Sequence, residues 1–384
     1  MSGSRTWKTW SLLGSAALVV GMVGAPAGIA SASSGAHKVL VSRSGWCDGK
    51  AALTTISAGV AAVNPGGTVQ VCRGTYDEDV VVTKPVTLHG LHALVDPGAD
   101  TSSPLYSLIG NNAFTVLSPH VTIRGFTAQG ATGDGIFLAG DRGLVENVLA
   151  RNNAVNGINV DGSSYSTIRG NTVTGNTGGI ELANDPHAAG ITLPGVTGTA
   201  THDLVIGNTV VKNPGACGIY LVDHAGTTDG TLNMTFGIHD NVIRNNKVVN
   251  NATSGYGGGV LLATEVPGGA VYHNLVAGNT IAGNQLSGVF LHSHLPNQYL
   301  NGNVIINNNI GKNNLTAFLE PDDPETTGIF IGTQDPLKIT IVGNKIHDDH
   351  YGIFTAGPVT VTSVKLNSFK NVTVHFGSVP VFTG

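Results

Sequence analysis

Four ionisable residues occupy one position of a repeated sequence motif. The motif reads Gly-[Ile/Val]-x-apolar, and the sixth residue after its glycine is, in four consecutive copies, Asp185, His224, Glu265 and His294. Asp223 and His292 lie close to this position in their own copies. Carboxylates and imidazoles can transfer protons or bind cations near neutral pH when they face a common space. Whether they share that space depends on the elements that carry them.

The motif belongs to a repeat that fills most of the chain. Its glycines are Gly135, Gly157, Gly179, Gly218, Gly259, Gly288 and Gly328, with a degenerate copy at Gly352. Between them recurs Asn-x-apolar-x-x-Asn, with copies at Asn147/Asn152, Asn171/Asn176, Asn208/Asn213, Asn246/Asn251, Asn279/Asn284 and Asn308/Asn313, and with Asp at the end of Asn344/Asp349. Each repeat offers three short β-branched runs separated by turn residues, which indicates stacked units. We predict an all-β fold, a right-handed parallel β-helix with an N-terminal helical cap, in which Asn side chains bond along the stack.

Stacking would bring equivalent residues of successive repeats to roughly 4.8 Å from one another. The ionisable position would then form a row. Beside it would run the outward-pointing residues that come two after each glycine: Phe137, Asn159, Glu181, Tyr220, Leu261, Phe290, Phe330 and Phe354. The connection to the next Asn lengthens from 6 residues after Asp141 to 23 after Asp185 and 22 after His224. Long loops on a compact scaffold are often functional, so we expect them to wall a cleft on coils 179–294. The alternative is that the row is a solvated edge of turn residues.

The N-terminal region divides into three parts. Residues 1–32 have a basic start, an apolar run and Ala30-Ser31-Ala32, which is typical of a cleaved secretory signal. Residues 33–46 form a lead-in of no strong character, and 47–384 form the β-helix domain, with a cap at 47–67 and coils from about 68 to 384. Within the cap, Leu53, Ile56, Val60 and Val63 fall on one face of a predicted helix, Lys50–Val63. Val359 to Gly384 would form a last coil that seals the far end.

The chain has three cysteines. Export permits a disulfide, and Cys47 and Cys72 flank one helix–strand unit, so we predict that they pair. Cys217 directly precedes a Gly-Ile strand and is expected to be a packed apolar residue.

Composition restricts the partners. Charged residues make up 11% of the 384 residues, so ladders and turns must stabilise the fold. Removal of the signal leaves 17 basic and 24 acidic residues, a net charge of −7. A negative surface disfavours nucleic acid and gives no attraction to anionic lipid. We expect a secreted monomer with no membrane span after signal removal.

The motifs resemble those of the parallel β-helix repeat family, which holds pectin lyase-like proteins and NosD-like copper-accessory proteins. The resemblance covers about 47–384 and includes Pro65-Gly66-Gly67-Thr68-Val69 and Gly74-Thr75-Tyr76. It implies the fold. For function it implies only a range, because the family spans lyases, hydrolases, epimerases and proteins without catalytic activity.

The leading hypothesis is a protein that binds or acts on polysaccharide in the cleft. Asp185 and Glu265 would be the carboxylates and His224 and His294 the proton-transfer residues, with Tyr220, Phe290, Phe330, Asp223 and His292 contacting sugar. An acidic glycan would be repelled without a cation, so a lyase reaction would need Ca²⁺ on Asp185, Asp223 and Glu265. Asp185-Pro186-His187 resembles in part the Asp-Pro-His core of alginate C5-epimerases, although Ala188 and Leu182 depart from that pattern.

Two other classes stay open. Seven histidines fall between His187 and His294, and imidazoles that faced one cleft would suit copper in a NosD-like accessory protein. A non-catalytic structural solenoid would also fit the low charge. The sequence does not decide whether the chain is an enzyme.

Overall fold

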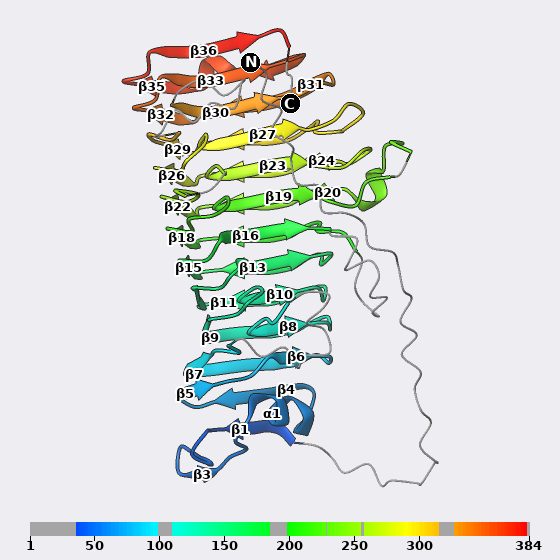
Figure 1. Cartoon of the computed structure of the whole chain (residues 1–384), viewed down its shortest axis with the longest axis vertical. Coiled ribbons are helices and arrows are strands. Elements are labelled where there is room, and N and C mark those ends of the chain that lie inside the picture. Colours follow the sequence, from blue (N-terminus) through cyan, green and yellow to red (C-terminus); the bar gives the residue numbers. More distant parts are fainter. Residues whose placement is uncertain are drawn as a thin grey trace, which may run out of the picture. The chain divides into compact units, whose positions relative to one another are not determined.

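The computed structural model describes residues 36–98, 110–184, 198–227, 229–254, 257–314 and 326–381. All of them belong to one compact unit, Gly35–Gly384. The predicted signal segment, residues 1–32, lies outside the described residues, so its prediction stands as it was made. The described residues form a parallel β-helix (Figure 1), as the repeat predicted.

One sheet takes one strand from each coil, and the Gly-[Ile/Val]-x-apolar motifs form its strands from β10 to β33. We refer to it as the 11-stranded sheet. Its members are β6 (Val80–Val82), β8 (Phe114–Val116), β10 (Ile136–Leu138), β13 (Asn156–Asp161), β16 (Gly178–Ala183), β19 (Ile219–Asp223), β23 (Val260–Thr264), β27 (Val289–Ser293), β30 (Thr327–Gly332), β33 (Tyr351–Ala356) and β36 (Val374–Val379).

The other large sheet has 21 strands and takes two strands from most coils. Its members are β1 (Ala36–Val41), β4 (Val63–Val71), β5 (Gly74–Tyr76), β7 (Thr87–Val95), β9 (Thr122–Gln129), β11 (Leu144–Glu146), β12 (Leu149–Arg151), β14 (Thr167–Arg169), β15 (Thr172–Thr174), β17 (Leu204–Ile206), β18 (Thr209–Val211), β21 (Val242–Arg244), β22 (Lys247–Val249), β25 (Leu275–Ala277), β26 (Thr280–Ala282), β28 (Val304–Ile306), β29 (Asn309–Ile310), β31 (Leu337–Val342), β32 (Lys345–His347), β34 (Val359–Thr362) and β35 (Ser368–Lys370). Smaller elements are β2 (Trp46–Cys47), β3 (Lys50–Ala51), β20 (Ile238–His239), β24 (Val271–Tyr272), α1 (Ile56–Ala62), and the 3₁₀ turns η1 (Met234–Phe236) and η2 (Val364–Leu366).

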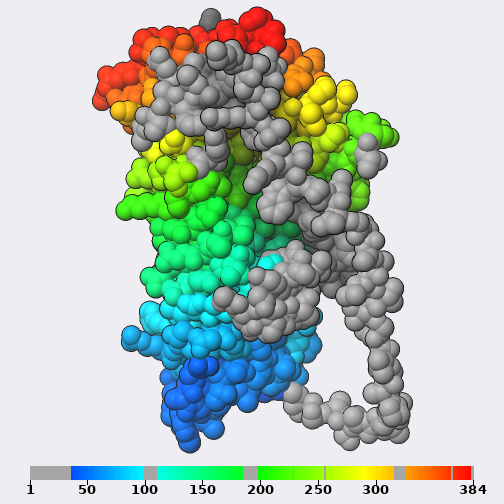
Figure 2. All heavy atoms as spheres, viewed as in Figure 1, coloured from blue at the N-terminus to red at the C-terminus, as the bar shows by residue number. Residues whose placement is uncertain are grey.

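The core is a set of apolar columns inside the stack. In the 11-stranded sheet, Ile180 pairs in register with Ile219, and Ile219 with Val260. All three side chains are fully buried in one continuous apolar cluster. Each strand contributes little apolar area by itself, so the coils are stable only when stacked. Successive parts of the sequence form successive layers of the stack, which Figure 2 shows as bands of colour from blue to red.

Buried asparagines connect each coil to the next through side-chain hydrogen bonds. In one ladder, Nδ2 of each Asn donates to Oδ1 of the next, as Asn171 does to Asn208 and Asn208 to Asn246, both at 3.0 Å. A second ladder runs in the same way through Asn153, Asn176, Asn213, Asn251, Asn284 and Asn313. The predicted axial bonding is confirmed.

The first predicted copy of the Asn repeat was out of register by one residue. Ala150 pairs with Val173, so that Val148 and Asn153 occupy the ladder positions, and not Asn147 and Asn152. Asn147 and Asn152 have φ values of 52° and 53° and occupy the left-handed position just before the ladder. Asn is among the few residues other than Gly that adopt this conformation readily.

The helix of the N-terminal cap is shorter than the predicted Lys50–Val63. Helix α1 begins at Ile56 because Thr55 accepts a hydrogen bond from the Ala58 N–H as the N-cap. Lys50 pairs instead within the β2–β3 hairpin. The helix packs closely on the first coil, since a Cβ at Gly59 would lie 2.6 Å from a Val41 methyl group. It therefore covers the open end of the core, as expected of a cap.

The predicted lead-in contains a strand of the first coil. Residues 36–41 form β1, which pairs in parallel with β4, and Val41 is fully buried. The alternation of Val39 and Val41 with more exposed neighbours is the pattern of a half-buried strand. The first coil therefore begins before the cap.

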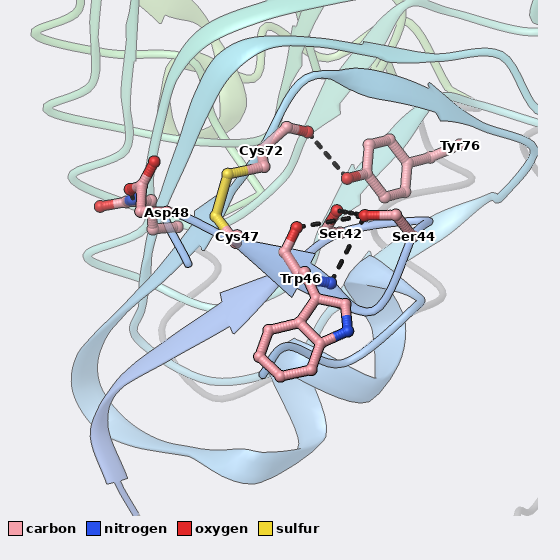
Figure 3. The surroundings of a disulfide bond; sticks show 8 residues. Ser42, Ser44, Trp46, Cys47, Asp48, Cys72 and Tyr76 are labelled. Carbon is pink, nitrogen blue, oxygen red and sulfur yellow. Dashed lines mark hydrogen bonds between the residues drawn. A yellow bond between two sulfur atoms is a disulfide. The ribbon is translucent and has the colours of Figure 1, made fainter. Parts of the chain in front are cut away.

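The predicted disulfide is confirmed. Cys47 and Cys72 are bonded, with their Cα atoms 5.8 Å apart, and join the hairpin to the end of β4 (Figure 3). The Tyr76 hydroxyl donates a 2.8 Å hydrogen bond to the Cys72 carbonyl, which fixes the chain beyond the bridge. Cys217 is buried and unbonded, as expected.

The last coil is present but only partly closed. β36 pairs with β33. Phe376 pairs with Ile353 and so continues the core column by one coil, yet its side chain is 45% exposed. Among the described residues, no helix combines the length and apolar character needed to cross a membrane.

Candidate functional site

The predicted outward column exists in the 11-stranded sheet. The residues that follow each motif glycine by two are paired in register from β10 to β33, through Phe137, Asn159, Glu181, Tyr220, Leu261, Phe290, Phe330 and Phe354. Asp223 pairs with Thr264 and Thr264 with Ser293, so the next residues, His224, Glu265 and His294, leave the sheet at one edge. Asp185, the fourth predicted member of this row, lies outside the described residues.

His224 lies between two carboxylates from its neighbouring coils. Its Nε2 is 3.5 Å from Glu181 Oε1, and its Nδ1 is 3.5 Å from Glu265 Oε2. The His224 side chain is 28% exposed, Glu181 13% and Glu265 50%. One half-buried imidazole thus has a carboxylate at each ring nitrogen and access to solvent. Such an arrangement stabilises the imidazolium form and suits proton transfer.

Glu181 is held in place by a second residue that the row did not predict. Asn156 Nδ2 donates a 2.7 Å hydrogen bond to Glu181 Oε2, while Asn156 Oδ1 accepts from the Tyr220 hydroxyl. The Asn156 amide is therefore oriented by both partners. Burial, and after it the nearby charges of Glu181 and Asp134, raise the pKa of Tyr220 well above its usual value, so Tyr220 acts as a hydrogen-bond donor.

Asp134 anchors this network from below. Its Oδ1 accepts from the Asn156 backbone N–H at 2.8 Å and its Oδ2 from Asn159 Nδ2 at 3.2 Å. Burial raises the pKa of Asp134 to about 7, assisted by the Glu181 charge and opposed by the hydrogen bonds from Asn156 and Asn159. The polar network consequently spans the strands from β10 to β23.

The two histidines of β27 and its following turn interact with each other. His292 Nε2 lies 2.7 Å from His294 Nε2, and the His294 backbone N–H donates to Gln298. Burial and the neighbouring His294 lower the pKa of His292 well below its usual value, which keeps that ring neutral. The structure brings His224 and Glu265 together and pairs His294 with His292.

Asp223 has a structural task in the described residues. It is buried, and its carboxylate accepts from Asn184 Nδ2 and from the N–H groups of Ala225 and Ala270. These hydrogen bonds connect the end of β19 to the preceding coil through Asn184 and to the following coil through Ala270. They occupy both carboxylate oxygens, which differs from the substrate and calcium contacts expected for Asp223.

The predicted calcium ligands do not converge in the described part of the chain. There, the one group of three candidate ligands within reach of a common ion is Cys47, Asp48 and Cys72, and both its cysteines are in the disulfide. With Asp185 outside the described residues, the full predicted set stays untested.

Two of the expected sugar platforms are buried. Phe330 is 1% exposed and Phe290 8% exposed, and their ring centroids lie 5.0 Å apart in an edge-to-face contact. Stacking of successive coils makes neighbouring outward rings cover one another, so they form a second apolar cluster with Phe354. Tyr220 is partly buried, and its hydroxyl donates to Asn156 in the network.

The histidines proposed for copper lie in more than one place. His202 and His239 are stacked between Tyr165 and Tyr272 in a column of rings at the start of the returning strands. His224, His292 and His294 belong to the 11-stranded sheet edge, and His187 lies outside the described residues. The described imidazoles therefore do not surround one ion.

Shallow pockets of about 230 and 390 Å³ occur elsewhere, one near Lys345 and Lys370 and one near Lys38 and Leu53. The cleft expected over coils 179–294 involves residues 185–197, outside the described part, and stays a prediction.

Sequence reasoning missed Glu181, Asn156 and Asp134 as parts of the site. Glu181 was placed correctly in the outward column, where it is the one acidic residue among apolar, aromatic and amide side chains. That contrast was the available signal. Asn156 gave no such signal in the sequence, because its role depends on contacts with side chains of two other strands, Glu181 of β16 and Tyr220 of β19.

Known proteins agree with this architecture. The family model described as "Right handed beta helix region" matches residues 109–271 and 201–369, well over half of the chain. No curated protein matches the sequence.

Several solved structures share the fold at low sequence identity. The A-module of mannuronan C-5 epimerase AlgE4 from Azotobacter vinelandii has a TM-score of 0.55 and 15% identity, covering 85% of this chain and 93% of that one. The AlgE6 A-module from the same organism has a TM-score of 0.53 and 16% identity, with coverages of 85% and 92%. A hyperthermoactive exopolygalacturonase from Thermotoga maritima has a TM-score of 0.51 and 13% identity, with coverages of 80% and 72%. The stacked coils, their ladders and the family match together establish that this chain belongs to the right-handed β-helix family.

Proposed function

We propose that this chain acts on a polysaccharide at the edge of the 11-stranded sheet, with His224 as the proton-transfer residue. The observation that carries the proposal is the placement of His224 between Glu181 and Glu265, each 3.5 Å from a different ring nitrogen. Polysaccharide as the substrate class is supported by the names of structural neighbours, which include an epimerase and a polygalacturonase. At such low sequence identity the structural similarity supports the fold alone, and the reaction is our inference.

The chemistry follows from the surroundings of the ring. The imidazole ring of a histidine can accept or donate a proton near neutral pH. Glu181, held by Asn156, fixes the ring and stabilises its charged form, while the half-exposed Glu265 can reach a bound sugar or a water molecule. Positioned acid–base groups of this kind contribute about 10² to 10⁴ in rate.

We also propose that the protein is exported. The N-terminal segment has the composition of a secretory signal, and the Cys47–Cys72 disulfide is typical of oxidising compartments. N-terminal sequencing of protein recovered from the culture medium would test this, and a retained N-terminus inside the cell would contradict it.

His224→Gln should abolish turnover. We expect a loss of about 10² to 10⁴ in kcat/KM with little change in thermal stability, because the ring is only partly buried. A panel of neutral and acidic polysaccharides, with and without Ca²⁺, would be followed by reducing ends, by absorbance of new C=C bonds and by proton exchange. The control is His37→Gln, which removes an exposed histidine of the first coil, away from the candidate site. Full activity of the His224 variant would exclude this site.

A further inference from the structure

Positive charge is absent from the 11-stranded sheet. None of its strands contains Lys or Arg, whereas Lys38, Arg124, Arg169, Lys247 and Lys345 are examples from the 21-stranded sheet. The sequence segments that leave the 11-stranded sheet around the candidate site, 184–203, 224–241, 265–274 and 294–303, also contain no Lys or Arg. Most basic residues of the described chain lie on the 21-stranded sheet, its turns and the two ends, whereas Arg142 lies in the turn that leaves the 11-stranded sheet after β10.

Hydrogen-bond acceptors predominate on the same face. Glu181 and Glu265 present carboxylates, and Asn159 pairs with Glu181 in the outward column. Asn159 is 9% exposed, its Nδ2 donates to Asp134, and its Oδ1 has no hydrogen-bond partner among the described residues. A buried carbonyl oxygen without a donor is destabilising. This acceptor, independent of the carboxylates, indicates a ligand that supplies donors.

We infer that the polysaccharide taken by this site carries free amino groups and no carboxylates. The inference rests on the proposed function and specifies its substrate class. An ammonium group close to a carboxylate is attracted to it, more strongly near a protein surface than in bulk water, and a uronate carboxylate is repelled. At this edge of the sheet the turn after β10 carries Arg142, two coils from β16, with its guanidinium over the Tyr165 ring. The segments that leave β16, β19 and β23 carry no Lys or Arg to offset that repulsion.

A neutral glycan fits less well. Uncharged sugars are commonly bound on exposed aromatic faces, yet Phe290 and Phe330 are buried in their own cluster. The described recognition groups at the site are the carboxylates of Glu181 and Glu265, the Asn159 carbonyl and His224. The carboxylates and the carbonyl accept hydrogen bonds and attract positive charge.

Binding of three matched hexasaccharides tests this inference: one of glucosamine, its fully N-acetylated counterpart, and one of uronate. Calorimetry at mildly acidic pH and low salt should show the glucosamine oligomer binding at least tenfold more tightly than either of the others. Raised salt should weaken that binding, because the charges face solvent. Glu265→Gln should weaken it by roughly tenfold or more, the loss of one charge-assisted hydrogen bond.

Asp240→Asn is the matched control, since it removes one exposed acidic charge beside His239 in the column of rings. Its binding should be unchanged. Equal weakening in both variants would show non-specific attraction and overturn the inference, as would preference for the uronate or for the acetylated oligomer. In those cases His224-dependent turnover of any polysaccharide would still support the proposed function, so the two failures are distinguishable.

Discussion

Asn156 connects the parts of the candidate site at the scale of single residues. Its side chain donates to Glu181 and accepts from Tyr220, and its backbone N–H donates to Asp134. An amide with both ends engaged cannot rotate without losing a hydrogen bond. Asn156 is therefore a positioning residue that aims Glu181 at His224.

Asn156→Asp should change the pH dependence of the reaction. The new carboxylate would lie where Nδ2 now contacts Glu181, and two carboxylates so close cannot both ionise easily. We expect the acidic limb of the kcat/KM profile to move to higher pH, with a smaller effect on KM. Asn297→Asp, an exposed turn position with a φ of 63°, serves as the control. A profile that coincides with that of the wild type would contradict the role assigned to Asn156.

The sequence predicted which residues share a column but not how their side chains pair. Alternation along the strand was sufficient to place Glu181, Tyr220 and Leu261 side by side. The choice of Asn156 by both Glu181 and Tyr220 depends on rotamers and on distances across three coils. Burial of Phe290 and Phe330 was missed for a related reason, because an outward ring is covered when the next coil carries another ring.

At the scale of elements, the Asn ladders determine how coils are joined. Most of these buried Asn residues donate to the next Asn and to a backbone carbonyl on the preceding coil, as Asn208 does to Asn246 and to the Ile168 carbonyl. Such a residue bridges three coils, whereas Asn313 donates to the Gly311 carbonyl of its own coil. The second ladder ends at Asp349, whose Oδ1 accepts from the Asn313 N–H and whose Oδ2 has no partner among the described residues.

Asp349→Asn should stabilise the protein. Burial raises the pKa of Asp349 to about 8, so the native state keeps a proton that the unfolded chain has released above its ordinary pKa near 4. The free energy of unfolding therefore falls as pH rises from about 4 to about 8 and is level above that. Asparagine does not titrate, so the advantage of the variant should grow across this window. Denaturant melts at several pH values would measure it, and a constant difference would refute the assignment.

The strands could be predicted well because the Asn and Gly positions delimit each β-branched run. The first copy was misplaced because Asn147, Leu149 and Asn152 match the Asn-x-apolar-x-x-Asn pattern. Only the pairing of Ala150 with Val173 shows that Val148 and Asn153 are in register with the next copy. The helix was begun too early because Leu53 continues its apolar period, while the Thr55 cap and the hairpin at Lys50 determine the actual start.

For the whole molecule, the two ends differ in how they protect the core. Helix α1 closes the first coil and is itself fixed at both ends, by Glu78 accepting from the Ile56 and Ser57 N–H groups and by Lys84 donating to the Ala61 and Val63 carbonyls. The last coil leaves Phe376 partly exposed. Fraying should therefore depend on the cap at one end and on the final strand at the other.

Removing the disulfide by Cys47→Ser and Cys72→Ser should loosen the first coil. The bridge closes a separation of 25 residues and is worth about 3 kcal/mol. Hydrogen exchange should rise at the β1 and β4 amides and stay unchanged at β22, because each coil contacts mainly its neighbours. Cys217→Ala is the control. Uniform acceleration along the chain would show that the stack unfolds as one unit instead.

The ladders have a further consequence for how such a protein can change over time. Consecutive Asn partners are separated by 37, 38, 33, 29 and 36 residues from Asn171 to Asn344, yet their Nδ2–Oδ1 distances stay between 2.9 and 3.0 Å. Extra chain is accommodated at the turn and leaves the spacing of the coils unaltered. Doubling a flexible loop costs only about 0.6 kcal/mol in closure entropy. Evolution can therefore reshape the rim of this surface by insertion and deletion while the scaffold beneath it is inherited intact.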